Sequence, residues 1–417
     1  MTENIEKTEW KNDKSSNGLL FYCNPEKLYN SENIACFDLD WTIIRPEIGK
    51  KFPISIDDWG FAFKMDKLRE HYKNGYKIVI MSNQKGSYSG KGSFTFDDFQ
   101  KRWFDIQKVL KVPAYILAAP LDDLNRKPLY GMWEFMEKNL NGDLKINYKN
   151  SFYVGDACGR PKDHSDCDIK FAINCGLNFK TPEEFFEGST QFPFEELKLN
   201  LRGFNPIKYL EDFNEHFNKN QSIIENNLKS WKDIKDVLEG NFENIKVRMI
   251  VLVGSPASGK TTLAQKILDL NSSCKEPRTW NIYSLDQEGS KKKMTTKLSI
   301  ILKETSKCCI IDATNGKLEM RNEWIKLAKD INIDIDVVCI HINIEKKITL
   351  HLNDLTGLKK SINEDYPFKE VPKVAIHTFW KHFVEPTKDE NFSSIIKLDF
   401  EPIFENETDK KLFEILF

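Results

Sequence analysis

Residues 247–261 read VRMIVLVGSPASGKT, an apolar run that passes directly into a glycine-rich stretch. The run has the length and unbroken hydrophobicity of a buried strand in a parallel sheet. The stretch after it matches the pattern Gly-x-x-x-x-Gly-Lys-Thr, in which backbone N–H groups wrap phosphates before a helix begins. We therefore expect a strand, a phosphate-binding loop and a helix from about Thr261, the first unit of a nucleotide-binding α/β domain.

The side chains of this loop predict a site for ATP and Mg²⁺. Lys260 would reach the β- and γ-phosphates, and the Thr261 hydroxyl would ligate the metal. Further strands are expected near 280–285, 308–311 and 335–342. The residues expected to bind ATP are Gly254, Ser255, Ala257, Ser258, Gly259, Lys260, Thr261 and Thr262.

The first half of the chain shows the same alternation of strands and helices. Its apolar runs lie at 34–39, 77–82, 114–118 and 151–155, and the helical stretches between them include 58–74 and 97–110. Such βαβ alternation predicts a parallel sheet. The expected fold class is α/β, with two tandem doubly wound parallel-sheet domains. Their order is an extension with an edge strand over 1–30, a domain over 31–186, a helical connector over 187–244 and a domain over 245–417.

Two aspartates follow the first strong strand, in the stretch Cys36–Thr42 (CFDLDWT). Because side chains alternate along a strand, Asp38 and Asp40 would point to the same side. The carboxyl ends of the strands are where open α/β sheets bind ligands. One carboxylate can attack phosphorus, and the other can protonate the leaving oxygen and later deprotonate water. Magnesium would be needed to offset the repulsion between the acids and a phosphate.

Three later strand ends supply matching groups. Ser82 lies in MSNQKG, Lys127 in NRKP and Asp156 in VGDACGR. A hydroxyl and an ammonium can hold phosphoryl oxygens, and a third acid can complete the metal site. The four motifs in this order indicate phosphatase chemistry at an aspartate.

These stretches resemble the haloacid dehalogenase phosphatase superfamily and, more specifically, the 3'-phosphatase domain of the polynucleotide kinase/phosphatase family. The resemblance is carried by FDLDWT, MSNQKG, RKPLYGMW, VGDACGR, KDHSDCD and FAINCGLNFKTPEEFF. It implies a 3'-phosphatase domain over 31–186, with Asp38 as nucleophile and Asp40 as acid and base. It implies phosphate binding by Thr42, Ser82, Asn83 and Lys127, metal binding by Asp38, Asp40 and Asp156, and a weaker role near the metal for Asp168. Trp41 stands where the common pattern has Gly.

The second domain carries a candidate base in Leu285–Ser290 (LDQEGS). Asp286 there would either deprotonate an attacking hydroxyl or cap the helix that carries Lys291–Lys293, and the residues alone favour neither. The stretch resembles polynucleotide 5'-kinases, which implies that Asp286 is the general base. By the same resemblance, weaker candidates for positioning phosphates or acceptor are Asp312, Thr314, Asn315 and Arg321.

One feature of the family's kinases is missing. Their lid brings an Arg onto the phosphates, whereas Leu350–Leu355 reads LHLNDL. Lys359, Lys360 or another cation would have to substitute. The closing segment reads Trp380-Lys381 where the family has Arg-Lys.

The resemblance implies a bifunctional enzyme that heals DNA ends. The first domain would hydrolyse 3'-phosphates through a phosphoaspartate, and the second would phosphorylate 5'-hydroxyls with ATP. Two alternatives stay open. One is the same chemistry on RNA ends, because phosphate contacts do not distinguish the two nucleic acids. The other is a 3'-phosphatase whose kinase-like domain is an ATP-dependent DNA-end binding module, which the missing Arg favours.

Composition limits the partners and the compartment. With 61 Lys and Arg against 63 Asp and Glu, the formal charge is -2, so no global basic field attracts nucleic acid or anionic membrane. No apolar run approaches the length of a membrane span, and the polar N-terminus is unlike a secretory signal. We expect an intracellular protein with reduced thiols, and the resemblance implies a nuclear one without a forkhead-associated domain. Six basic residues near the phosphatase motifs have two equally good interpretations, a local basic patch or scattered solvated charges. They are Lys85, Arg102, Lys108, Arg126, Arg160 and Lys162.

Overall fold

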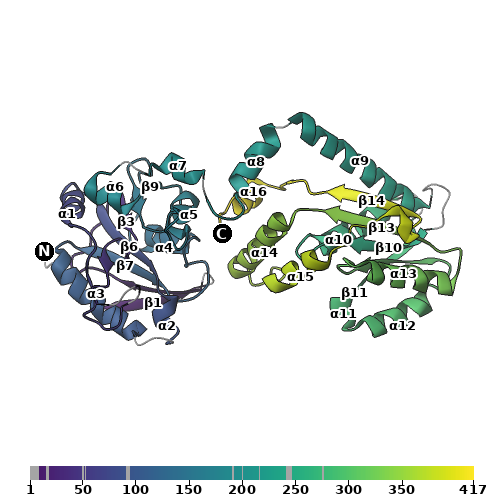
Figure 1. The fold of residues 1–417 in the computed structure, drawn as a ribbon, viewed down its shortest axis with the longest axis horizontal. Helices are drawn as coiled ribbons and strands as arrows, with labels where there is room; N and C mark the ends of the chain where they lie inside the picture. Colours follow the sequence, from purple (N-terminus) through teal and green to yellow (C-terminus); the bar gives the residue numbers. More distant parts are fainter. Residues whose placement is uncertain are drawn as a thin grey trace. The chain divides into compact units, whose positions relative to one another are not determined.

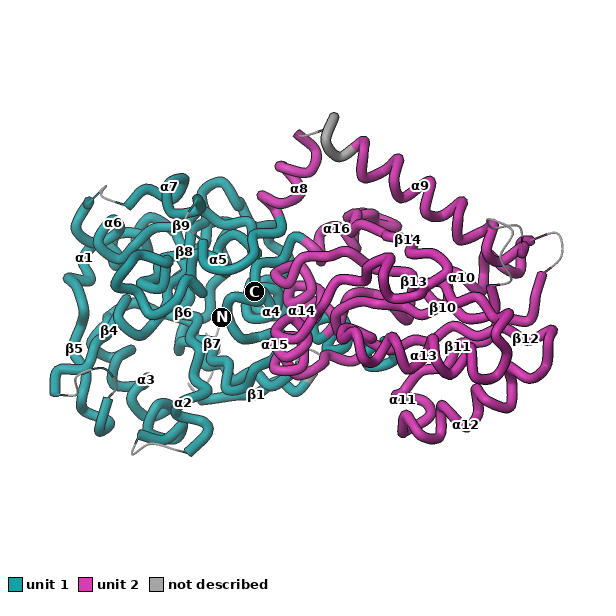
Figure 2. Tube along the Cα trace, turned by 45° about the vertical axis from the view of Figure 1, so that its right-hand side comes forward, with its two compact units in different colours: residues 1–206, 357–368, 414–417 teal, residues 207–356, 369–413 magenta. Residues whose placement is uncertain are grey.

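A computed structural model gives the chain two compact units (Figure 2). The first comprises Met1–Pro206, Gly357–Phe368 and Glu414–Phe417, and the second comprises Ile207–Thr356 and Lys369–Phe413. The structure describes residues 9–15, 18–48, 51, 53–90, 94–189, 192–199, 201–215, 217–240, 247–274 and 277–417. For residues 217–220 and 286 it describes the backbone only.

The first unit is built on a seven-stranded sheet in the order β1-β2-β7-β6-β3-β8-β9 (Figure 1). The five strands from β7 to β9 in this order are parallel, and β1 and β2 join the edge antiparallel. The runs expected to be strands therefore do form strands. Their bounds are β1 Trp10–Ser15, β2 Gly18–Cys23, β3 Ile34–Phe37, β6 Lys77–Asn83, β7 Ala114–Ala119, β8 Phe152–Val154 and β9 Asn178–Lys180.

Helices cover both faces of this sheet, as a doubly wound fold requires. One face packs against α1 (Asp66–Lys73), α3 (Phe96–Leu110) and α6 (Pro182–Glu187), around Leu68, Trp103 and Phe185. The other packs against α4 (Gly131–Asn139), α5 (Cys167–Asn174) and α7 (Phe194–Lys198), around Met136, Ile169 and Leu197. The short helix α2 (Lys85–Tyr88) follows β6.

The helix expected over 58–74 is shorter than predicted. Only residues 66–73 are helical, while Ile44–Arg45 and Gly60–Phe61 form the small strand pair β4 and β5. The cause is Asp58, whose buried carboxylate accepts N–H groups from Glu47 at 3.0 Å and Ile48 at 2.7 Å. These bonds hold the preceding segment as a loop, which helical periodicity in the sequence does not show.

The second unit contains a five-stranded parallel sheet in the order β11-β12-β10-β13-β14. Helices α9 and α10 pack on one face, and α12 and α13 on the other. The strands are β10 Val247–Val253, β11 Thr279–Ser284, β12 Lys307–Asp312, β13 Asp336–Asn343 and β14 Ser394–Asp399. The helices are α8 Pro206–Glu215, α9 Phe217–Glu239, α10 Lys260–Ser272, α11 Leu285–Glu288, α12 Lys291–Ile301, α13 Leu318–Ile331, α14 Lys346–Ile362, α15 Lys373–His382, η1 Lys388–Glu390 and α16 Glu407–Phe413.

The stretch expected as a connector, 187–244, is divided between the units. Helix α7 packs on the first sheet, whereas α9 buries Ile234, Val237 and Leu238 against the second. The apolar face of α9 is thus part of the second core. Among the helices that the structure describes, none has the length and apolar character to cross a membrane.

Candidate active sites

Three carboxylates meet at the carboxyl ends of β3 and β8 in the first unit. Asp38 follows β3, where its N–H donates to the carbonyl of Val154 at 2.8 Å. Asp156 follows β8, and Asp168 lies in the first turn of α5. One oxygen from each lies within 4.8 Å of the others. Such a set of oxygen donors suits a hard cation such as Mg²⁺.

Lys127 neutralises part of this cluster. Its Nζ lies 2.6 Å from Asp38 Oδ1, 2.8 Å from Asp168 Oδ1 and 2.6 Å from the hydroxyl of Tyr153. The Asn83 side chain fixes the Lys127 backbone, because it accepts the N–H at 2.9 Å and donates to the C=O at 3.0 Å. Asn83 therefore positions the lysine from the end of β6.

Asp40 stands apart from the three clustered carboxylates. Gln84 Nε2 donates to Asp40 Oδ2 and to the Ser82 hydroxyl, both at 2.9 Å. Asp168, which the sequence ranked low, thus takes the place in the cluster that we expected for Asp40. Thr42, also expected at this site, is buried, and its hydroxyl has no hydrogen-bond partner among the described residues.

Burial and neighbouring charges raise the pKa of three acids at this site, Asp38, Asp40 and Asp156. Burial raises the pKa of Asp38 to about 7, with Lys127 acting in the opposite direction and Asp168 and Asp40 adding to the rise. Burial raises the pKa of Asp156 to about 9, and Asp168 and Asp38 add to that rise. Burial also raises the pKa of Asp40. If these acids ionised together, the single ammonium of Lys127 would leave excess negative charge, which a divalent cation would offset, so the residues fit Mg²⁺.

Two of the basic residues considered for a nucleic-acid patch, Arg102 and Arg160, bind other groups of the first unit. Arg102 is buried and donates to the carbonyl of Ile56 at 3.0 Å. Arg160 pairs with Asp163 and Glu183, each at 3.0 Å. These two guanidinium groups therefore stabilise loops of the first unit.

The phosphate-binding loop of the second unit has the expected path from β10 into α10. Gly254 donates its N–H to the carbonyl of Thr314 at 3.1 Å. Gly259, with a φ of 85°, precedes the helix, a conformation that glycine adopts at little cost. Lys260 Nζ donates to the Ser255 carbonyl at 2.6 Å. The buried hydroxyls of Ser255 and Ser258 have no hydrogen-bond partner among the described residues.

Thr261 and Asp312 form the candidate metal pair of this unit. The hydroxyl of Thr261, in the first turn of α10, donates to Asp312 Oδ2 at 2.8 Å. Asp312 is the last residue of β12, so the fold brings together two oxygen groups that could hold a metal, although they are separated by 51 positions. Thr262, also expected at the nucleotide, is exposed.

Asn315 and Arg321 have structural contacts instead of free polar groups. Asn315 Nδ2 donates to the carbonyl of Leu252 at 2.8 Å, and its Oδ1 accepts from Trp324 Nε1 at 2.9 Å. Arg321 is fully buried, and its Nε and Nη2 each lie 2.6 Å from a Glu390 oxygen. Neither side chain is placed to receive a phosphate.

The structure describes the predicted lid lysines but only the backbone of Asp286, the predicted base. The side chain of Asp286 lies outside the described residues. Ser290 is the N-cap of α12, since its hydroxyl accepts the Lys293 N–H at 3.3 Å, so the capping alternative for Asp286 is wrong. Lys360 donates to the carbonyl of Tyr366 at 2.9 Å within the stretch 357–368 of the first unit.

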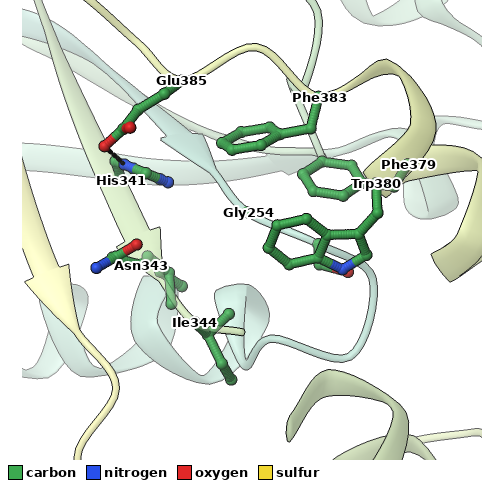
Figure 3. A pocket seen from close by; sticks show the side chains of 10 residues that line it. Gly254, His341, Asn343, Ile344, Phe379, Trp380, Phe383 and Glu385 are labelled. Carbon is green, nitrogen blue, oxygen red and sulfur yellow. Dashed lines mark ion pairs between the residues drawn. The ribbon is translucent and has the colours of Figure 1, made fainter. Parts of the chain in front are cut away.

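A small pocket of about 50 Å³ adjoins the loop (Figure 3). The rings of Phe379, Trp380 and Phe383 line one side, and His341 and Asn343 at the end of β13 lie opposite. Burial lowers the pKa of His341 to about 4, so the ring is neutral near pH 7. No motif in the sequence marked this pocket, because its walls come from separate segments.

Residues 33–186 match the family model described as polynucleotide kinase 3 phosphatase. The bifunctional polynucleotide phosphatase/kinase of Schizosaccharomyces pombe is 31% identical over 384 residues, which cover 91% of this chain and 83% of that protein. The chain belongs to the polynucleotide phosphatase/kinase family. The family and fold class predicted from the motifs are thereby confirmed.

Two further relatives match different extents of the chain. The putative bifunctional polynucleotide phosphatase/kinase of Acanthamoeba polyphaga mimivirus is 29% identical, over 90% of this chain and 87% of that protein. The polynucleotide 3'-phosphatase of Saccharomyces cerevisiae is 31% identical, over 37% of this chain and 88% of that protein. The Saccharomyces cerevisiae protein therefore matches only part of this chain, whereas the mimivirus protein matches most of it.

Proposed function

We propose that the chain heals nucleic-acid ends, with DNA as the substrate. The first unit hydrolyses 3'-phosphates, and the second transfers the γ-phosphate of ATP to 5'-hydroxyls. The observation that supports this most strongly is the contact between Lys127 and Asp38, beside the carboxylates of Asp156 and Asp168. It supports the proposal because the residues that we assign as nucleophile, phosphate-binding cation and metal ligands lie close together.

The phosphatase reaction takes two displacements. An Asp38 oxygen attacks phosphorus, and the bond to the 3'-oxygen breaks as that oxygen takes the proton of Asp40. Water then attacks phosphorus in the aspartyl phosphate and gives a proton back to Asp40. The bond between phosphorus and the Asp38 oxygen breaks, so inorganic phosphate leaves and the Asp38 carboxylate is restored. Burial raises the pKa of Asp40, which suits an acid, and Gln84 holds its carboxylate.

In this reaction, one set of residues binds the phosphoryl oxygens and another set would bind the metal. Lys127 and the hydroxyls of Ser82 and Thr42 bind the oxygens. Asp38, Asp156 and Asp168 would hold Mg²⁺, which when bound stabilises the negative charge that develops on the phosphoryl group.

The kinase reaction uses the phosphate-binding loop. Backbone N–H groups of the loop after Pro256 and the side chain of Lys260 hold the phosphates of ATP, and Thr261 and Asp312 would hold Mg²⁺. The acceptor hydroxyl attacks the γ-phosphorus, loses its proton to Asp286 and leaves ADP. The role of Asp286 rests on the family resemblance.

One experiment tests both activities. Oligonucleotides that carry a 3'-phosphate or a 5'-hydroxyl, in matched DNA and RNA versions, are incubated with Mg²⁺, ATP and full-length protein. Asp38→Asn should abolish phosphate release and keep 5'-phosphorylation, and Lys260→Ala should do the reverse. Retention of phosphate release by Asp38→Asn would refute the first assignment.

The same experiment decides between the alternatives. Faster processing of RNA than DNA would make RNA ends the substrate. A wild-type protein that removes 3'-phosphates but never phosphorylates 5'-hydroxyls would make the second unit an ATP-dependent binding module, consistent with the missing lid Arg. A nuclear location rests on the family alone, and imaging of the tagged full chain would test it.

A further inference from the structure

Trp41 is the one exposed residue in an otherwise buried segment beside the phosphatase site. From Ile34 to Ile44 every other residue is buried, except Asp40, which is half-buried. Trp41 is 40% exposed. Its indole has no aromatic, cationic or hydrogen-bonding partner among the residues that the structure describes. An exposed tryptophan in this position does not contribute to the core.

The backbone of Trp41 is in an unfavourable conformation. Its φ is 64°, the left-handed region that costs a non-glycine residue roughly 1–2 kcal/mol. The turn is fixed, because the Trp41 N–H donates to the Ile44 carbonyl at 2.6 Å and Asp40 bridges to Ile44. Glycine would occupy this position without strain. Backbone strain at the edge of an active site points to a function for the side chain that causes it.

The neighbours of Trp41 are parts of the proposed phosphatase site. Asp40 on one side is the candidate acid, and Thr42 on the other has a buried hydroxyl without a hydrogen-bond partner among the described residues. The base of a nucleotide lies one sugar away from its 3'-phosphate. A phosphate bound at this strand end therefore brings the terminal base within reach of the adjacent residue.

We propose that Trp41 is a positioning residue that stacks on the base of the nucleotide carrying the 3'-phosphate. This inference rests on the proposed phosphatase function. Every base has a π-face, so stacking accepts all of them and adds affinity without sequence preference. The ring would hold the terminal sugar in register with Asp38 while touching no reacting atom.

The test compares substrates that differ only in the terminal base. One 3'-phosphorylated oligonucleotide carries a normal terminal nucleotide, and the other carries an abasic one. Trp41→Gly should raise KM for the base-bearing substrate roughly 5- to 150-fold, the range for loss of one stacked base. It should leave kcat nearly unchanged and KM for the abasic substrate within twofold. Trp41→Phe should restore most of the affinity.

Lys111→Gly is the matched control for backbone strain. Lys111 also has a positive φ, 60°, and ends α3 in the same unit. Both glycine variants should keep or raise the Tm, and Lys111→Gly should leave both KM values unchanged. A fall in Tm for Trp41→Gly, or an equal loss on both substrates, would show a structural role and overturn the stacking proposal.

The outcome also separates this inference from the function beneath it. If wild-type protein releases phosphate from both substrates and Trp41→Gly has the same KM values, the stacking proposal is wrong but the phosphatase function stands. If wild-type protein releases no 3'-phosphate, the proposed phosphatase function fails, and stacking fails with it.

Discussion

Arg321 and Glu390 form a double ion pair inside the second unit, with Nε and Nη2 each 2.6 Å from a carboxylate oxygen. Both side chains are buried. Removing one partner leaves an uncompensated buried charge, which typically costs 3–5 kcal/mol. We expect Arg321→Met to lower the free energy of unfolding of the second unit by about that amount in urea titrations of the full chain. Lys326→Met, at an exposed position of the same helix, should change it little.

A different result for Arg321→Met would contradict the structural role of this ion pair. A variant with wild-type stability and a raised KM for ATP would mean that Arg321 binds phosphate, as the sequence suggested. The sequence suggested a phosphate-binding role because the ion-pair partner of Arg321, Glu390, lies 69 positions away along the chain. No local pattern shows such a pair.

The strand ends of both units were predictable for a physical reason. Buried parallel strands are unbroken apolar runs, and the polar residues after them, such as Asp38 and Lys260, stand out against these runs. Groups that act through a tertiary contact do not stand out. Gln84 is ordinary in sequence, and only the fold shows that its amide links Asp40 to Ser82. Asp168 likewise reaches the cluster formed with Asp38 and Asp156 only through the placement of α5.

Magnesium should distinguish Asp168 from Asp40 as a ligand. A ligand that binds only the folded state stabilises it, by about 2.7 kcal/mol at a hundredfold excess over Kd. We expect Mg²⁺ to raise the Tm of wild-type protein, and Asp168→Asn to remove most of the shift of the first unit. Asp40→Asn should keep that shift while losing phosphatase activity. Loss of the shift in Asp40→Asn alone would restore the assignment made from the sequence.

Lys127 lies buried among the residues of the proposed phosphatase site. Its ammonium contacts Asp38, Asp168 and Tyr153, all buried. Lys127→Met should reduce kcat for 3'-phosphate release by 10²-fold or more, because a preorganised cation for the phosphoryl oxygens is lost. Exposed Lys138 gives the control, and Lys138→Met should match wild type in a phosphate-release assay. Near-normal kcat in Lys127→Met would exclude a role in the reaction.

Asn174 binds the segment 414–417 through hydrogen bonds to Leu416. Its amide accepts the Leu416 N–H and donates to the Leu416 carbonyl, both at 2.9 Å, and it also donates to Pro128 at 2.9 Å. Buried backbone groups that lose a partner cost about 1–3 kcal/mol. Asn174→Ala should destabilise the first unit by that amount in thermal or urea unfolding, while Asn139→Ala, on an exposed part of α4, should be nearly neutral. Equal stability of both variants would show that this segment contributes nothing.

His351 should make the second unit sensitive to acid. The ring is buried on α14, and Nε2 lies 2.7 Å from the Phe413 carbonyl. A carbonyl only accepts, so Nε2 carries the proton in the neutral ring. Burial lowers the pKa of His351 to about 4, against an ordinary value of 6.5.

The sign of the pH effect follows from that lowered pKa. Between pH 6.5 and 4 the unfolded chain binds a proton at His351 that the folded chain does not. Stability is therefore full above pH 6.5 and falls toward pH 4, by up to about 3 kcal/mol at 1.36 kcal/mol per pH unit. His351→Gln keeps an N–H donor for the Phe413 carbonyl but cannot titrate. Urea midpoints of this variant should fall less than those of wild type between pH 7.5 and 4.5, whereas the exposed control His382→Gln should follow wild type. Parallel curves for His351→Gln and wild type would show that this histidine does not control acid stability.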